Sequence, residues 1–240
     1  LPGGKDYLTA DAAGTLFTWA YSSPVQTAGF TGHTAVYGVD FNSTGTLGAS
    51  CGANGPIQLW NLETGASVRQ LAGHEGAVYS VRFSADDKML VSSSADGTVR
   101  VWNVADGALI KSLAISRAEG EIAPPIFDAE FSPDGQLVAA GGSEGIIQLW
   151  NIPSGELVRG IGEKGEAIYR VDFSPAGNRL LGCGHAGTLT VSNVADGAAV
   201  FSMKLPSVAY SAHYGPDGAS VIAACSNGNS YLVPIPEGAR

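Results

Sequence analysis

The sequence predicts an all-β protein built from repeated antiparallel sheets of four short strands each. Three observations carry this prediction: a repeat of about 41 residues, an abundance of glycine, and turn sequences at fixed places in the repeat. The chain has 240 residues, of which 33 are glycine, roughly twice ordinary usage. Glycine at this level, without a collagen triplet, favours many tight turns between short strands over long helices.

Tryptophan marks the repeat. It closes a short apolar segment four times, and two weaker copies carry serine or valine instead, at Trp19, Trp60, Trp102, Trp150, Ser192 and Val233. The successive intervals are 41, 42, 48, 42 and 41 residues. A second series keeps the same step at Phe41, Phe83, Phe131, Phe173 and Tyr214. Because the two series agree, the repeat extends over the whole chain.

The third repeat shows the expected strands in order. A first strand at 78–83 is followed by a polar turn and a second strand at 89–94. Asp96-Gly97 is a hairpin-turn pair that leads into a third strand at 99–102, and another turn leads to a fourth at 109–113. One such meander cannot bury both of its faces, whereas meanders stacked radially can. The sequence therefore predicts a β-propeller.

Short motifs in the repeats match those of a known family. The third repeat contains Gly73-His74, Asp96-Gly97 and Trp102-Asn103, and the fourth contains Phe-Ser-Pro-Asp-Gly at 131–135. With these motifs in these places, the chain resembles the WD40-repeat β-propeller family over essentially its whole length. The resemblance is specific for the fold and much less specific for function, because this fold hosts many roles.

The resemblance divides one domain, residues 1–240, into about six blades. The expected blades are 1–33, 34–74, 75–115, 124–163, 164–205 and 206–240. The first should lack its first strand and the last its fourth strand, and such unpaired edges are costly. We therefore expect a piece of a longer chain, or a ring completed by other residues, with seven or more blades when intact.

The resemblance also implies a buried hydrogen-bond network of His, Ser, Asp and Trp that locks a blade. Only the third repeat is expected to have all four members, at His74, Ser92, Asp96 and Trp102. The second repeat has Asn54 at the aspartate position, and later repeats lose most members. These residues might be taken for a catalytic triad, but we interpret them as structural.

The first strand of each repeat carries the strongest functional signal. Its apolar residues, such as Val78, Val81 and Phe83, cannot share one face by strict alternation, so a β-bulge is expected near Tyr79-Ser80. The re-aimed residue is aromatic in all five copies: Tyr37, Tyr79, Phe127, Tyr169 and Tyr210. In the WD40 family this place lies on the top face, where partners dock. The alternative is that these rings only pack between blades and plug the mouth of the channel.

A lengthened connection at 116–125 is expected on the same face. Arg117, Glu119 and Glu121 make it polar, and insertions in repeat arrays often map to the binding face. The alternative is a tolerated surface loop.

Polar residues precede the aromatic that ends each first strand: Asp40, Arg82, Glu130, Asp172 and His213. They suggest either an acid/base or metal site, or a charge-compensated ring between blades. We favour the second interpretation, and predict no catalytic residue, metal or cofactor. Cys51, Cys183 and Cys225 occupy small-residue positions and are expected to be buried reduced thiols.

Charge narrows the choice of partner. Thirteen basic residues against 22 acidic ones give a net charge of −9, which argues against a nucleic-acid surface or a polybasic membrane patch. The predicted function is a non-catalytic, cytoplasmic scaffold that docks a protein or peptide on the aromatic top face. The alternatives are a structural propeller within a larger enzyme or assembly, and a propeller that binds a small ligand or catalyses through channel carboxylates.

Overall fold

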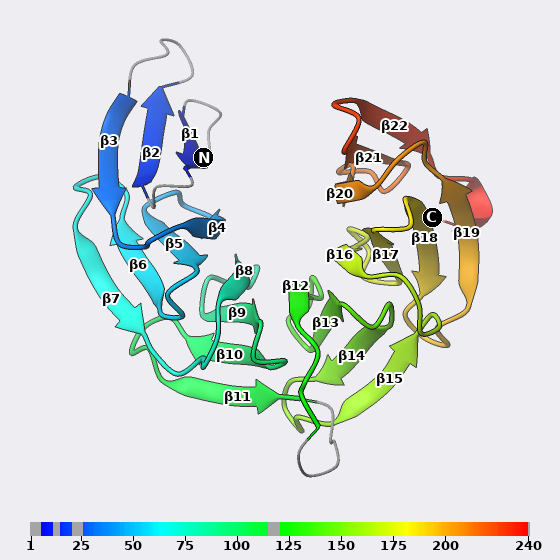
Figure 1. Ribbon diagram of the computed structural model, residues 1–240, viewed down its shortest axis with the longest axis horizontal. Helices are drawn as coiled ribbons and strands as arrows, with labels where there is room; N and C mark the ends of the chain where they lie inside the picture. The colour runs from blue at the N-terminus through cyan, green and yellow to red at the C-terminus, as the bar shows by residue number, and fades with distance from the viewer. Residues whose placement is uncertain (1–5, 12–14, 21–25, 115–120, 240) are drawn as a thin grey trace. The chain divides into compact units, whose positions relative to one another are not determined.

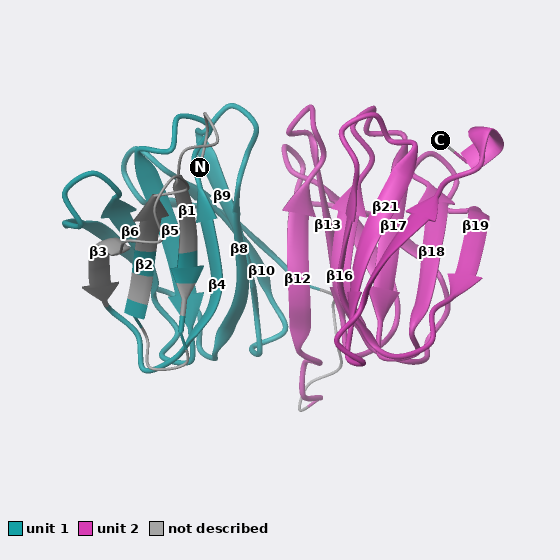
Figure 2. Ribbon diagram, turned by 90° about the horizontal axis from the view of Figure 1, so that it is seen from above, with its two compact units in different colours: residues 1–114 teal, residues 115–240 magenta. Residues whose placement is uncertain are grey.

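The computed structural model describes residues 6–11, 15–20, 26–114 and 121–239. Within these ranges the regular elements are antiparallel strands, apart from one short 3-10 helix, η1 (Glu237–Ala239) (Figure 1). The predicted all-β class is confirmed. The chain forms two compact units, Leu1–Ala114 and Ile115–Arg240 (Figure 2). A single domain over 1–240 stays a prediction.

The first unit contains three sheets whose strands are neighbours in chain order. The described part of the first sheet has the three strands β1 (Asp6–Ala10), β2 (Thr15–Ala20) and β3 (Gln26–Thr31). The second sheet has β4 (Val36–Phe41), β5 (Leu47–Gly52), β6 (Ile57–Asn61) and β7 (Ser67–Leu71). The third sheet has β8 (Val78–Phe83), β9 (Met89–Ser94), β10 (Val99–Asn103) and β11 (Leu109–Leu113).

The second unit repeats the pattern. Its first sheet has β12 (Ile126–Phe131), β13 (Leu137–Gly142), β14 (Ile147–Asn151) and β15 (Leu157–Ile161). The next has β16 (Ile168–Phe173), β17 (Arg179–Gly184), β18 (Thr188–Asn193) and β19 (Ala199–Lys204). The last sheet, counted over the described residues, has three strands, β20 (Ala209–Tyr214), β21 (Ser220–Cys225) and β22 (Ser230–Pro234).

Turn chemistry explains where the strands end. Gly97, between β9 and β10, has φ of 75°, a left-handed conformation that glycine adopts without steric cost. The turn between β8 and β9 also contains a residue in the left-handed conformation, but here it is Asp87, with φ of 61°. Its carboxylate accepts a hydrogen bond from the backbone N–H of Ser43 in the preceding sheet at 2.8 Å. Asp87 therefore joins two sheets at a position where glycine would make no such contact.

The predicted β-bulge is present in each of the five first strands. Between β8 and β9 the pairing passes from Val78 to Ser80 and skips Tyr79. The same shift occurs in the other four sheets, at Tyr37, Phe127, Tyr169 and Tyr210. Because a bulged residue leaves the ladder, its side chain is re-aimed.

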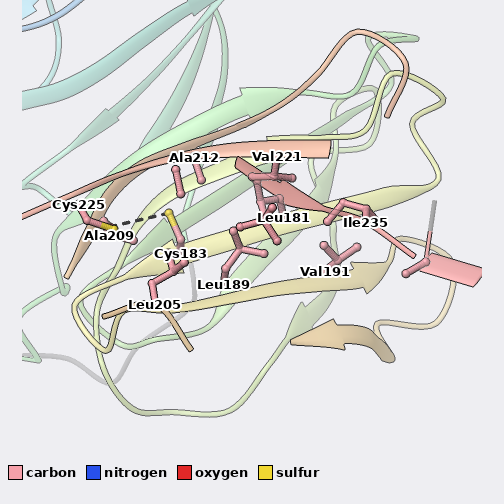
Figure 3. Close-up of a cluster of buried hydrophobic side chains, with 13 residues drawn as sticks. Leu181, Cys183, Leu189, Val191, Leu205, Ala209, Ala212, Val221, Cys225 and Ile235 are labelled. Carbon is pink, nitrogen blue, oxygen red and sulfur yellow. Dashed lines mark hydrogen bonds between the residues drawn. The ribbon is translucent and has the colours of Figure 1, made fainter. Parts of the chain in front are cut away.

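Sheets within a unit pack face to face through apolar side chains. Between the last two sheets, Leu181, Leu189 and Val191 meet Val221 and Ile235, all at most 1% exposed (Figure 3). On the opposite face of the last sheet, Ile222 and Leu232 are 53% and 73% exposed.

Candidate binding surface

The bulged aromatic residues form two rows, one in each unit. The first aromatic row consists of Tyr37 and Tyr79, whose rings stack at 5.8 Å between centroids. The second aromatic row consists of Phe127, Tyr169 and Tyr210; Phe127 meets Tyr169 edge-on at 5.5 Å, and Tyr169 stacks on Tyr210 at 5.9 Å. Each row therefore runs across neighbouring sheets.

These rings pack on one another and still face solvent. Tyr37 is 51% exposed and Tyr210 is 60% exposed, while Tyr79, Phe127 and Tyr169 are partly buried. Mutual packing restricts the rings without removing their outer surface from water. The rings therefore contact each other between sheets of one unit and leave an aromatic surface exposed to solvent.

Polar contacts position the middle of the second aromatic row. The hydroxyl of Tyr169 lies 3.1 Å from Nδ1 of His185, in the turn between β17 and β18. The two rings also meet edge-on at 6.1 Å. On the other side of the imidazole, Nε2 lies 3.9 Å from a carboxylate oxygen of Glu166. The Tyr169 ring is therefore oriented from a neighbouring turn as well as by its own strand.

Carboxylates behind the rows tether the first strands of neighbouring sheets within each unit. Asp40 on β4 accepts a hydrogen bond from the backbone N–H of Phe83 on β8 at 2.8 Å. Asp172 on β16 accepts one from Tyr214 on β20 at 2.7 Å. These strands lie at the edges of their sheets, so each tether satisfies an edge N–H. The carboxylates act between sheets, as in the charge-compensated interpretation.

Burial alters the acidity of one tether. Desolvation raises the pKa of Asp40, against the lowering effects of the Phe83 N–H and the Arg82 guanidinium. Since the pKa is raised, ionised Asp40 is favoured less in the folded chain than in the unfolded chain. Its contribution to stability is therefore largest at low pH, and declines as pH rises through the raised pKa.

A buried ion pair reinforces the second unit. Nη1 of Arg170 lies 3.4 Å from Oδ1 of Asp128, with side chains 9% and 3% exposed. Asp128 also accepts the backbone N–H of Val171 at 3.1 Å, and Nη2 of Arg170 lies 3.2 Å from Nδ1 of His213. The sequence interpretation missed Asp128 and Arg170. The available signal was their position directly after the bulged aromatic, where the first unit has Gly38 and Ser80.

The network of the third sheet is a continuous chain of hydrogen bonds. The Trp102 indole N–H donates to Oγ of Ser92 at 2.9 Å. Ser92 lies 2.8 Å from Nε2 of His74, and Nδ1 of His74 lies 2.9 Å from Oδ2 of Asp96. These partners require the tautomer that carries its proton on Nδ1, with the serine hydroxyl donating to Nε2. The four side chains therefore link the second and third strands to the loop before the first.

The second sheet corrects the expectation that only one network is complete. His33 bridges Ser50 and Asn54 with both contacts at 2.8 Å, and Trp60 donates to Ser50 at 2.8 Å. The amide oxygen of Asn54 accepts from the imidazole N–H as a carboxylate would. A neutral acceptor therefore suffices for this geometry.

This comparison predicts a specific pH effect. Burial by itself would raise the pKa of Asp96, but hydrogen bonds from His74, Thr98 and Glu75 outweigh it and hold the pKa well below its usual range. A lowered pKa contributes stability above about pH 4 that is lost progressively as pH falls. Asp96→Asn, which copies Asn54, should lower the free energy of unfolding by about 1–2 kcal/mol at pH 7. Urea unfolding should then show a smaller further loss of stability between pH 7 and pH 3 than in the wild type. An equal loss over this pH range in both proteins would contradict the role of Asp96.

No group of three or more His, Cys, Asp or Glu side chains in the described ranges is arranged to hold a metal ion. The thiols of Cys51, Cys183 and Cys225 are buried. Desolvation, with the nearby negative charges, raises the pKa of the Cys183 thiol to about 12, so this sulfur stays protonated and unreactive.

Two residues expected in the 116–125 connection, Arg117 and Glu119, lie outside the described residues. Glu121 is exposed, and the following Ile122 is 92% exposed. In the described part of the chain, no helix is long and apolar enough to span a membrane.

Four-stranded antiparallel meanders that pack face to face, with His–Ser–Trp networks in the second and third sheets, give an all-β fold whose sheets resemble the blades of a β-propeller. In the comparison with family models, the WD domain, G-beta repeat (WD40), matches residues 22–61, 65–103 and 119–151. These three stretches therefore contain WD40 repeats. No curated protein matches the chain.

Proposed function

We propose that this chain is a non-catalytic docking platform that binds a protein or peptide on its two aromatic rows. WD40 repeats generally serve as scaffolds for protein interaction. The observation that carries the proposal is that every bulged first-strand residue is aromatic and that the rings stack while partly exposed. We also propose that the six sheets are blades of one propeller, and that the buried cysteine thiols fit a reducing compartment such as the cytoplasm.

The mechanism is rigid presentation. Tyrosine offers a large contact area and a hydroxyl with few rotatable bonds, and it is enriched at binding hot spots. Here the bulge, the stacking partner and, for Tyr169, the His185 contact already restrict the ring. A partner therefore binds without much further loss of side-chain entropy.

Other uses of the fold have weaker support. A role inside a larger assembly is favoured by apolar residues on the outer strands, where Val68 and Leu109 are 52% and 46% exposed. A channel-carboxylate enzyme is disfavoured because Asp40 and Asp172 already accept backbone N–H groups.

Two matched pairs of substitutions test the docking surface. Tyr79→Ala with Tyr169→Ala should abolish capture of a partner by the immobilised chain, because one ring is lost from each row. Leu109→Ala with Leu157→Ala removes comparable exposed side chains from outer strands, 46% exposed in each case, and should leave capture unchanged. The melting temperature of both variants should stay close to that of the wild type. Loss of capture by the outer pair alone would instead support contact through the outer strands.

A further inference from the structure

A cavity of about 280 Å³ lies between the sheet β12–β15 and the sheet β16–β19. Its walls come from Ile147 and Ile161 on the first sheet and from Ile168 and Gly182 on the second. The cavity is part of the second unit alone, and all of its lining residues are described. Neither the aromatic rows nor the carboxylate tethers account for it.

The cavity lies where the second and third sheets place the hydrogen-bond network. Ser192 stands opposite Leu180, as Trp102 stands opposite Leu90. Gly182 stands opposite Val171, as Ser92 stands opposite Val81. By the same register, Ala186 takes the place of Asp96 and Lys164 that of His74. All four network positions have therefore changed, and three have lost most of their side chain.

The missing volume explains why the space is open. In the third sheet the Trp102 ring is 2% exposed and packs against the preceding sheet among Leu59, Leu71 and Val78. With Ser192 at that position, the indole is absent and the preceding sheet contributes Ile147 and Ile161 to the walls instead. Ile147 leans over Gly182, where an added Cβ would lie 2.8 Å from its Cδ1. This isoleucine fills only part of the vacated space.

The walls of the cavity are mostly apolar, with hydroxyl groups at two positions and carboxylates at its mouth. Thr190 and Ser192 bring hydroxyl groups, and Ser192 is 4% exposed. Glu163 and Glu166 lie at the exposed edge. Lys164, between them in sequence, is 3.4 Å from Glu144, and His185 is 3.9 Å from Glu166. At neutral pH the mouth therefore carries an excess of negative charge.

We propose that this cavity binds a planar aromatic ring about the size of an indole, carrying an N–H donor and no negative charge. An apolar cavity of about 150 Å³ in another protein binds benzene, so a larger one with isoleucine walls accommodates a bicyclic ring. The hydroxyls and carboxylates accept hydrogen bonds from an N–H group, and the acidic mouth favours a cation over an anion. The ring takes the place that tryptophan has in the second, third and fourth sheets. The cavity is distinct from the aromatic rows, although Glu166 at its mouth contacts His185, which in turn contacts Tyr169 of the second row.

Titration calorimetry with indole, tryptamine and indole-3-acetate tests the class of ligand. Tryptamine should bind most tightly, indole next, and indole-3-acetate least, because the carboxylate meets the acidic mouth. The absence of binding by both indole and tryptamine, or tightest binding by indole-3-acetate, would overturn the proposal. The ring could come from a tryptophan side chain of a partner protein or from a free metabolite. A pentapeptide with one central tryptophan between glycines distinguishes these two sources. Binding of the peptide indicates a side chain of a partner, whereas binding of tryptamine without binding of the peptide indicates a free metabolite.

Cavity-filling variants locate the binding. Ser192→Phe fills the space from within the sheet and should weaken tryptamine binding by at least about tenfold while raising the melting temperature. Ala186→Leu fills it from the turn between β17 and β18, and serves if the buried substitution prevents folding. Met203→Phe adds a ring on the same strand β19 but on its opposite face, beside Leu189, where Met203 is 43% exposed, and should leave binding unchanged. Unaltered affinity in both filled variants would refute this location.

Discussion

Trp102→Ala is expected to lower the free energy of unfolding by about 3–5 kcal/mol, because it removes a buried aromatic ring and leaves a cavity. The indole is 2% exposed and belongs to the cluster that joins the second and third sheets. Its N–H also donates to Ser92, so the substitution disturbs a network that includes His74 and Asp96. Urea unfolding at pH 7, followed by circular dichroism, measures the loss.

A conservative variant separates packing from hydrogen bonding. Trp102→Phe keeps an aromatic ring but removes the N–H donor and the five-membered part of the indole, so it should cost clearly less than the alanine variant, about 1–3 kcal/mol. Equal losses for phenylalanine and alanine would show that the hydrogen bond, and not the packing, dominates. A loss below about 1 kcal/mol for alanine would contradict the role of Trp102 in the core.

The second large effect is expected at the buried ion pair. Arg170→Met should destabilise the chain by about 3–5 kcal/mol, since the Asp128 carboxylate would stay buried without the guanidinium beside it. Adding Asp128→Asn removes the charge and should recover a substantial part of that loss. Chemical denaturation of the two single variants and the double variant gives the coupling energy.

An exposed ion pair provides the control. Lys88 and Asp86 approach to 3.1 Å, with side chains 80% and 53% exposed. Lys88→Met should change stability by less than about 1 kcal/mol, because water already screens the two charges. If Arg170→Met and Lys88→Met lowered the free energy of unfolding by similar amounts, burial would not determine how much an ion pair contributes.

Much of the fold was predictable from spacing. The 41- to 48-residue steps and the Asp-Gly turns located the strands of the third repeat to within one residue, with β10 extending to Asn103. The 3-then-2 spacing of apolar residues predicted the bulge, because period-2 strands allow no other way to bury all three. These features follow from local geometry, which a sequence records directly.

Features that depend on packing were harder to predict. Asn54 was taken to break a network, yet its amide oxygen accepts the same imidazole N–H. Asp128 and Arg170 are 42 residues apart, and only the stacking of two sheets brings them together. The sequence showed that the fifth repeat had lost its network, but whether isoleucines close the space or leave a cavity depends on three-dimensional packing.

The carboxylate tethers have a consequence for how such a chain can diverge. At Asp40 and Asp172 the donor on the neighbouring sheet is a backbone amide, which every residue except proline supplies. A duplicated repeat can therefore change its side chains widely and still offer its neighbour the same anchor. The Asp128–Arg170 pair lacks this freedom, because both partners are side chains and must change together. Repeats joined by the first kind of contact can drift independently, whereas those joined by the second kind must evolve as a pair.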